Sequence, residues 1–182
     1  MNKEIYQYVR CLYCKDKKEE MVVHYFADHS NFRAIHPQKI WPYFNRGICT
    51  NRIGYLMRGY VFLYANKDVP KVFLQNIPYV EGVLGYVDDE EGYLRGKDRE
   101  FAELLLENNG ILNCLSGTMH DGFLSIDDDF MRRFNAKILR VDKRSQSVEV
   151  SFSLIENEQK CWFGYVTPEI EADWRMQRLI AQ

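Results

Sequence analysis

The sequence of 182 residues has no apolar run near the ~20 residues that a helix needs to cross a bilayer. It begins without the long apolar core of a secretory signal, so we expect a cytoplasmic protein with reduced thiols. Its five cysteines are an odd number at irregular spacing, which does not suit a disulfide framework. Glycine-rich phosphate loops and the common nucleophile and metalloprotease motifs are also missing. We therefore expect neither an enzyme nor a cofactor, and no membrane partner.

A large net charge is also missing, because 24 Lys and Arg balance 26 Asp and Glu. This balance excludes a histone-like basic protein and an acidic disordered chain. The charges are nevertheless unevenly distributed. Residues 1–70 carry 11 basic and 6 acidic side chains, whereas residues 71–132 carry 5 and 13. We interpret the basic segment as the part that approaches a polyanion, with random surface variation as the alternative.

Residues 1–110 predict an α+β domain. Runs rich in β-branched and aromatic residues alternate with stretches whose apolar residues recur at helical spacing. The resulting order is strand, helix, strand, hairpin, strand, helix, strand, helix, with the hairpin at residues 39–58. Such an order favours one mostly antiparallel sheet with flanking helices.

The second part of the chain predicts a small β-barrel. We expect residues 111–119 to form a linker and residues 120–171 to contain four or five short strands. Within them, residues 148–154 alternate between apolar and polar side chains, which is typical of a half-buried strand. Residues 172–182 predict an amphipathic tail helix.

Two groups of potential metal ligands stand out. Cys11, Cys14, His24 and His29 have a spacing close to that of a zinc finger. However, the two cysteines lie at the end of a predicted strand, where their odd spacing places them on opposite faces. We therefore interpret them as ordinary thiols. The acidic runs at residues 88–91 and 127–129 are interpreted as solvated loops, because adjacent carboxylates alone do not form a cation site.

Basic and aromatic residues are interleaved in residues 1–70, most densely in the predicted hairpin at residues 39–58. Lys and Arg attract phosphates regardless of sequence, and exposed aromatic rings stack on unpaired bases. This pattern favours nucleic-acid binding. The alternative is a solvated hairpin whose aromatic residues belong to the core.

Three stretches resemble the NusG family of transcription elongation factors, and in particular its specialised antiterminators of the RfaH and LoaP type. They are Leu12-Tyr13-Cys14-Lys15, Leu56-Met57-Arg58-Gly59-Tyr60-Val61-Phe62-Leu63 and Asn76-Ile77-Pro78-Tyr79-Val80. In the second part, residues 136–144 resemble the first hairpin of a KOW module. The resemblance implies an NGN domain at residues 1–110 followed by a divergent KOW domain with an SH3-like barrel at residues 120–171. Met57-Arg58 replaces the usual Phe-Pro of the family.

The resemblance also implies a function. The first domain of such factors binds the clamp helices of RNA polymerase through an apolar patch and suppresses pausing and termination. By position, we expect this patch to contain Tyr13, Met57, Tyr60 and Phe62. Alternation along residues 59–65 leaves open which face of the strand is core and which is exposed.

The basic residues would then lie near nascent RNA or near the upstream or non-template DNA. For this contact we expect Lys15, Arg46, Arg52 and Arg58. The KOW-like domain would contact a ribosomal protein, although its divergence indicates that this partner is altered or lost. The alternative function is an RNA-binding module that acts independently of polymerase.

Overall fold

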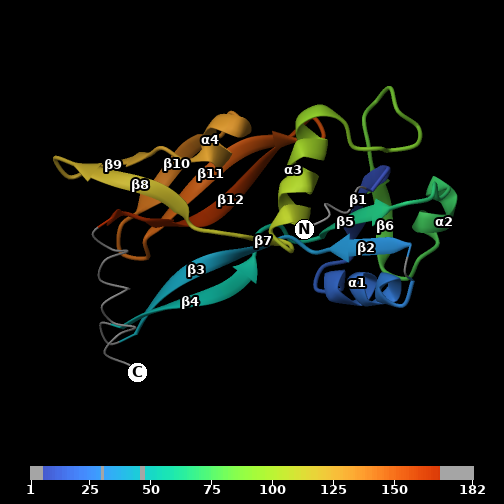
Figure 1. Cartoon of the computed structure of the whole chain (residues 1–182), viewed down its shortest axis with the longest axis horizontal. Helices are drawn as coiled ribbons and strands as arrows, with labels where there is room; N and C mark the ends of the chain where they lie inside the picture. Colours follow the sequence, from blue (N-terminus) through green and yellow to red (C-terminus); the bar gives the residue numbers. More distant parts are fainter. Residues whose placement is uncertain (1–5, 30, 46–47, 169–182) are drawn as a thin grey trace. The chain divides into compact units, whose positions relative to one another are not determined.

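A computed structural model describes residues 6–29, 31–45 and 48–168 of the chain (Figure 1). It divides into two compact units. The first unit consists of Met1–Gln38, Met57–Gly110 and Leu154–Asn157. The second consists of Lys39–Leu56, Ile111–Ser153 and Glu158–Gln182. The hairpin at residues 39–58, expected within the first domain, thus groups mainly with the second unit.

The first unit is built on a four-stranded antiparallel sheet with the order β2-β5-β1-β6. Its elements follow the predicted order of helices and strands, which is confirmed. They are β1 (Tyr8–Cys14), α1 (Glu19–Ala27), β2 (Phe32–Ile35), β5 (Tyr60–Ala65), α2 (Lys71–Gln75), β6 (Val80–Leu84) and α3 (Gly96–Glu107).

Helices pack on both faces of this sheet. On one face, Val61 and Leu63 of β5 belong to a buried cluster with Val22 and Phe26 of α1 and with Leu74 of α2. On the other face, Phe62 packs against Phe101 of α3, with ring centroids 5.6 Å apart. Because side chains alternate along β5, the strand contributes residues to a core on each face of the sheet, and five of its six residues are buried.

The second unit contains two sheets. Together with the helices and the sheet of the first unit, they make the described chain a mixed α and β protein. The hairpin strands β3 (Gln38–Asn45) and β4 (Ile48–Tyr55) form a three-stranded sheet with β7 (Ile111–Leu112) in the order β4-β3-β7. The larger sheet has five strands in the order β10-β11-β12-β8-β9 and curls like half of a barrel (Figure 1). Its strands are β8 (Leu115–His120), β9 (Phe123–Ile126), β10 (Lys137–Asp142), β11 (Ser147–Leu154) and β12 (Asn157–Val166).

Two features of the second unit differ from the expectation. Residues 111–119, expected as a linker, form β7 and most of β8, because β8 pairs with both β9 and β12. A short helix, α4 (Asp129–Arg133), interrupts the predicted run of strands. Asp128 caps it by accepting a hydrogen bond from the Phe130 backbone N–H at 2.9 Å. The acidic run at residues 127–129 therefore has a structural role.

The core of the second unit is aromatic. Phe130 of α4 lies at the centre of a cluster with Phe134, Phe152 and Phe163, whose ring centroids are 4.9–5.4 Å from its own. The expected tail helix at residues 172–182 lies outside the described residues. Within the described part of the chain, each helix is too short or too polar to cross a membrane.

Candidate functional site

A row that contains two partly exposed tyrosines crosses the sheet of the first unit. Tyr60 on β5 lies opposite Tyr13 on β1, and Tyr13 lies opposite Gly82 on β6. The two tyrosine rings pack edge to face with their centroids 5.9 Å apart. Tyr13 is 43% exposed, and a side chain at Gly82 would meet no atom within 4 Å. We call Tyr13, Tyr60 and Gly82 the tyrosine row.

The tyrosine row lies on the same face as Phe62, because residues two apart in a strand share a face. Helix α3 covers this face at Phe62 but leaves Tyr13 exposed and Tyr60 half-buried. The next position on β6, the half-buried Leu84, lies opposite the buried Cys11. The open end of the face therefore presents two aromatic rings beside apolar surface, an arrangement that suits the docking of another protein.

Gly59 is the residue that allows this packing. Its φ of +79° lies in the left-handed region that favours glycine, and its carbonyl accepts a hydrogen bond of 2.7 Å from the Cys14 N–H. A Cβ at this position would lie 3.0 Å from Cε2 of Tyr13. The Gly59-Tyr60 pair of the sequence therefore has a physical reason: the glycine makes room for the ring of Tyr13.

Two buried polar side chains fix the turn before Tyr60. The Glu19 carboxylate accepts a hydrogen bond of 2.6 Å from the Gly59 N–H. Burial raises the pKa of Glu19, but backbone hydrogen bonds and the charges of His36 and Arg58 outweigh it, so this pKa is lowered. The His36 ring lies 3.0 Å from Oε1 of Glu20 and 3.2 Å from the Met57 carbonyl. The turn at residues 57–59 is thereby tied to α1.

The structure brings together two of the four expected polymerase-contacting residues. Tyr13 and Tyr60 form the tyrosine row, but Met57 is 4% exposed and Phe62 is completely buried. The expectation for Met57 and Phe62 is corrected, because α3 covers Phe62 and because the Met57 side chain is buried at the turn before Tyr60. Sequence reasoning also missed Gly82. Its register opposite Tyr13 was not visible without knowing that β6 pairs with β1.

The expected nucleic-acid residues do not form a single cluster. Lys15 and Arg58 are exposed in the first unit, and each lies two positions along the chain from a tyrosine of the row. Arg52 belongs to the hairpin of the second unit, where its guanidinium lies 3.4 Å above the centre of the Tyr43 ring. Arg46 lies outside the described residues. The exposed Ile53 and Tyr55 follow Arg52 on β4.

Another basic residue of the hairpin has a different role. Lys39 is only 8% exposed, donates a hydrogen bond to the Trp162 carbonyl and lies 4.8 Å from the centre of the Trp41 ring. Burial lowers the pKa of its ammonium group to about 8, although Cys161 opposes this shift. Lys39 therefore holds the hairpin against β12 and is not available to nucleic acid.

The lowered pKa of Lys39 predicts a pH dependence of stability. Between about pH 8 and pH 10.5 the folded chain loses this proton while the unfolded chain keeps it, so deprotonation favours folding. The free energy of unfolding of the natural chain should rise through this window relative to Lys39→Met, by at most about 1.4 kcal/mol per pH unit. Urea unfolding of both proteins measures this difference. A difference that stays constant across the window would contradict the buried position of Lys39.

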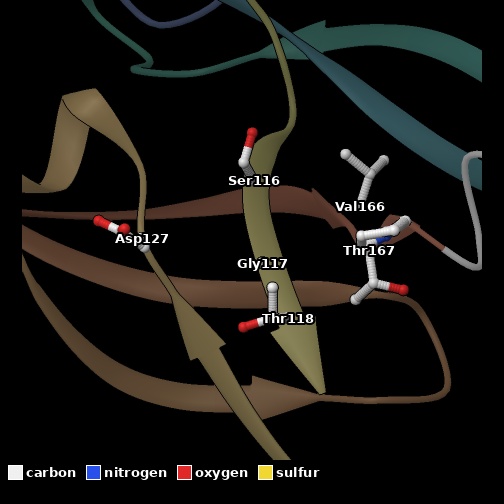
Figure 2. Close-up of a pocket in the computed structure, with 7 residues that line it drawn as sticks. Ser116, Gly117, Thr118, Asp127, Val166 and Thr167 are labelled. Carbon is white, nitrogen blue, oxygen red and sulfur yellow. The ribbon is translucent and has the colours of Figure 1, made fainter. Parts of the chain in front are cut away.

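A hollow of about 320 Å³ lies beside the start of β8 and the ends of β9 and β12 (Figure 2). Its described lining consists of Ser116, Gly117, Thr118, Asp127, Val166, Thr167 and Pro168. Asp127 forms an ion pair with the exposed Arg132. Hydroxyl groups and one paired carboxylate can hold a small polar molecule. These lining residues include no cysteine, histidine or lysine that would act as a nucleophile or base beside them.

The zinc-like spacing of the cysteines and histidines does not produce a cluster. Cys11 and Cys14 are buried, whereas His24 and His29 are exposed. Burial raises the pKa of the Cys11 thiol well above its usual value and that of Cys14 to about 12. In the described part of the chain, no three His, Cys, Asp or Glu side chains lie close enough together to hold a metal ion.

The acidic run at residues 88–91 is also structural. Asp89 accepts hydrogen bonds from the backbone N–H groups of Glu91, Gly92 and Tyr93. Its neighbour Asp88 pairs with Arg95 at 2.5 Å. The run interpreted as a solvated loop therefore organises its own loop through these hydrogen bonds.

No protein-family model matches the chain, and no curated protein matches its sequence. The tyrosine row combines exposure, aromatic character and a rigid support.

Proposed function

We propose that the protein is a non-enzymatic transcription elongation and antitermination factor of the NusG type. In this proposal the first unit is an NGN-like domain that binds RNA polymerase, and the half-barrel of the second unit is a divergent KOW-like domain. The observation that carries the proposal is the tyrosine row, which the segment Gly59-Tyr60-Val61-Phe62 places at the open end of a sheet.

The geometry of the row supports docking of a helical partner. Two aromatic rings held edge to face present a rigid apolar surface that loses little conformational entropy on binding. The missing side chain at Gly82 leaves a shallow place beside Tyr13 for a side chain of the partner. Exposed Lys15 and Arg58 favour a partner with acidic residues at the rim. The clamp helices of polymerase are the partner that the resemblance implies.

The hairpin supports a second contact, with nascent RNA or with upstream or non-template DNA. Arg52 stacks on Tyr43, and Tyr55 is 50% exposed further along β4. A guanidinium held over a ring and an accessible aromatic side chain are the groups that bind phosphate and stack on unpaired bases. This observation also favours the second candidate function, an RNA-binding module that acts without polymerase.

Binding to purified bacterial RNA polymerase separates the two candidates. The elongation-factor proposal predicts that the full chain binds core polymerase in the absence of nucleic acid. The RNA-binding alternative predicts strongly salt-dependent binding to single-stranded RNA and no affinity for polymerase alone. Biolayer interferometry with immobilised polymerase, and then with immobilised RNA, measures both. Absence of polymerase binding would contradict the main proposal.

A further inference from the structure

Strand β10 is an edge of the five-stranded sheet with an unusually open surface. Within the described chain it pairs with β11, and it stands at the end of the strand order. All six of its residues are exposed, including Ile138, Leu139 and Val141 at 38–43%. An open edge with apolar side chains is a template for pairing with another strand, and proteins usually protect such edges.

The turn that follows β10 leaves this edge accessible. Lys143 donates a hydrogen bond of 2.6 Å to the Gly122 carbonyl in the turn between β8 and β9. This contact lies beyond Asp142, the last residue of β10, and the strand itself stays exposed along its whole length. The edge therefore has room for an additional strand.

The sequence of β10 is complementary to itself in the antiparallel direction. It reads Lys-Ile-Leu-Arg-Val-Asp, so a second copy centred between Leu139 and Arg140 places Lys137 opposite Asp142 of the other copy. The same register places Ile138 opposite Val141 and, next to the two-fold axis, Leu139 opposite Arg140. Each of these pairs occurs twice because the arrangement has two-fold symmetry. Opposite charges and apolar pairs directly across two strands are both stabilising.

The faces of the sheet agree with this register. Ile138 and Val141 lie opposite Val150 and Val148 of β11, which are completely buried, so both side chains belong to the inner face. They share this face despite their odd spacing because the ladder shifts register between Ile138 and Arg140.

The two charged ends of β10 share the other face. Lys137 and Asp142 lie opposite Ser151 and Ser147. Each cross-copy pair therefore joins two side chains on the same side of the sheet, and the shift in register falls at the two-fold axis.

We infer that the protein self-associates through antiparallel pairing of β10 with β10 of a second copy. The resulting dimer joins the two half-barrels into one continuous sheet. A single strand buries a small surface, so the dimer is weak and reversible, and its population depends on protein concentration. This inference does not depend on polymerase binding.

Sedimentation velocity of the full chain over a wide range of concentrations tests the inference. We expect a reversible monomer–dimer equilibrium. Val141→Lys and Ile138→Glu should each raise the dissociation constant about tenfold or more, because each places an unpaired charge in an apolar pair. The double variant Ile138→Glu/Val141→Lys should restore the dimer at low salt, since the new carboxylate and ammonium lie opposite each other across the two copies.

Two further variants complete the test. Phe123→Lys is the matched control, because Phe123 is a 78% exposed apolar residue on β9, the other edge of the same sheet. It should leave the dissociation constant unchanged. Lys137→Asp changes an exposed side chain, and it should weaken the dimer because it places two carboxylates opposite each other.

Three results would overturn the inference. The first is a natural chain that stays monomeric at every concentration. The second is a dimer that responds to Phe123→Lys and not to Val141→Lys. The third is a double variant that is folded by circular dichroism but stays monomeric at low salt. That result would mean that residues 138 and 141 do not lie opposite each other across the two copies.

Discussion

Replacing Tyr13 and Tyr60 together by alanine should lower the affinity for RNA polymerase by about 100-fold. Tyrosines at the centre of an interface commonly dominate its binding energy, and these two rings support each other at 5.9 Å. Since Tyr13 is 43% exposed and Tyr60 is half-buried, the substitutions remove surface and little core. Titration of polymerase against the natural chain and the double variant measures the change.

Tyr25→Ala is the matched control for this experiment. Tyr25 is a 40% exposed tyrosine on α1, which packs on the opposite face of the sheet. Its replacement should leave the affinity for polymerase unchanged. An equal loss of affinity in Tyr25→Ala, or full affinity in the double variant, would show that the tyrosine row is not the binding surface. Phe62→Ala is unsuitable, because Phe62 is buried against α3.

The second large effect concerns Arg10, a buried cation in β1. Its guanidinium donates to the carbonyls of Val69 and Glu91 and lies 3.4 Å from the carboxylates of Asp68 and Glu91. It also stacks on Tyr93, with 4.1 Å between the guanidinium carbon and the ring centroid. We expect Arg10→Met to lower the free energy of unfolding of the first unit by about 3 kcal/mol, because two carbonyls lose their donor.

Arg95→Met provides the comparison. Arg95 pairs with Asp88 at the surface, where both side chains are more than half exposed. Exposed ion pairs contribute little to stability because water screens them, so this variant should stay close to the natural chain in urea denaturation. Similar losses in both variants would mean that Arg10 does not organise the segments around Val69 and Glu91.

The order of helices and strands in the first 110 residues could be predicted because it depends on local patterns. Alternation at period two and apolar spacing at period 3.6 are present in the sequence without any knowledge of the fold. The exposure of the site residues depends in addition on how the helices pack on the sheet. Alternation divides residues 59–65 into two faces, but it does not show that α3 covers Phe62 while Tyr60 stays half-buried. Burial of Met57 and Phe62 is therefore a tertiary effect.

Other differences have similar causes. The sequence pattern groups Lys39 with the basic residues of the hairpin that favour nucleic-acid binding. In the structure it is buried in the second unit, where it contacts Trp162 and Trp41. Composition reports the number of charges and not their exposure. Helix α4 has only five residues, so no periodicity could reveal it, although its cap at Asp128 leaves a signal in the sequence.

Readthrough of an intrinsic terminator tests the central claim most directly. The assay uses purified bacterial RNA polymerase, a defined template and the full chain, with the Tyr13→Ala/Tyr60→Ala and Tyr25→Ala variants beside it. The account predicts more full-length transcript with the natural chain and with Tyr25→Ala, and little or no increase with the double variant. Readthrough that is the same with and without the natural chain, while polymerase is active, would contradict it.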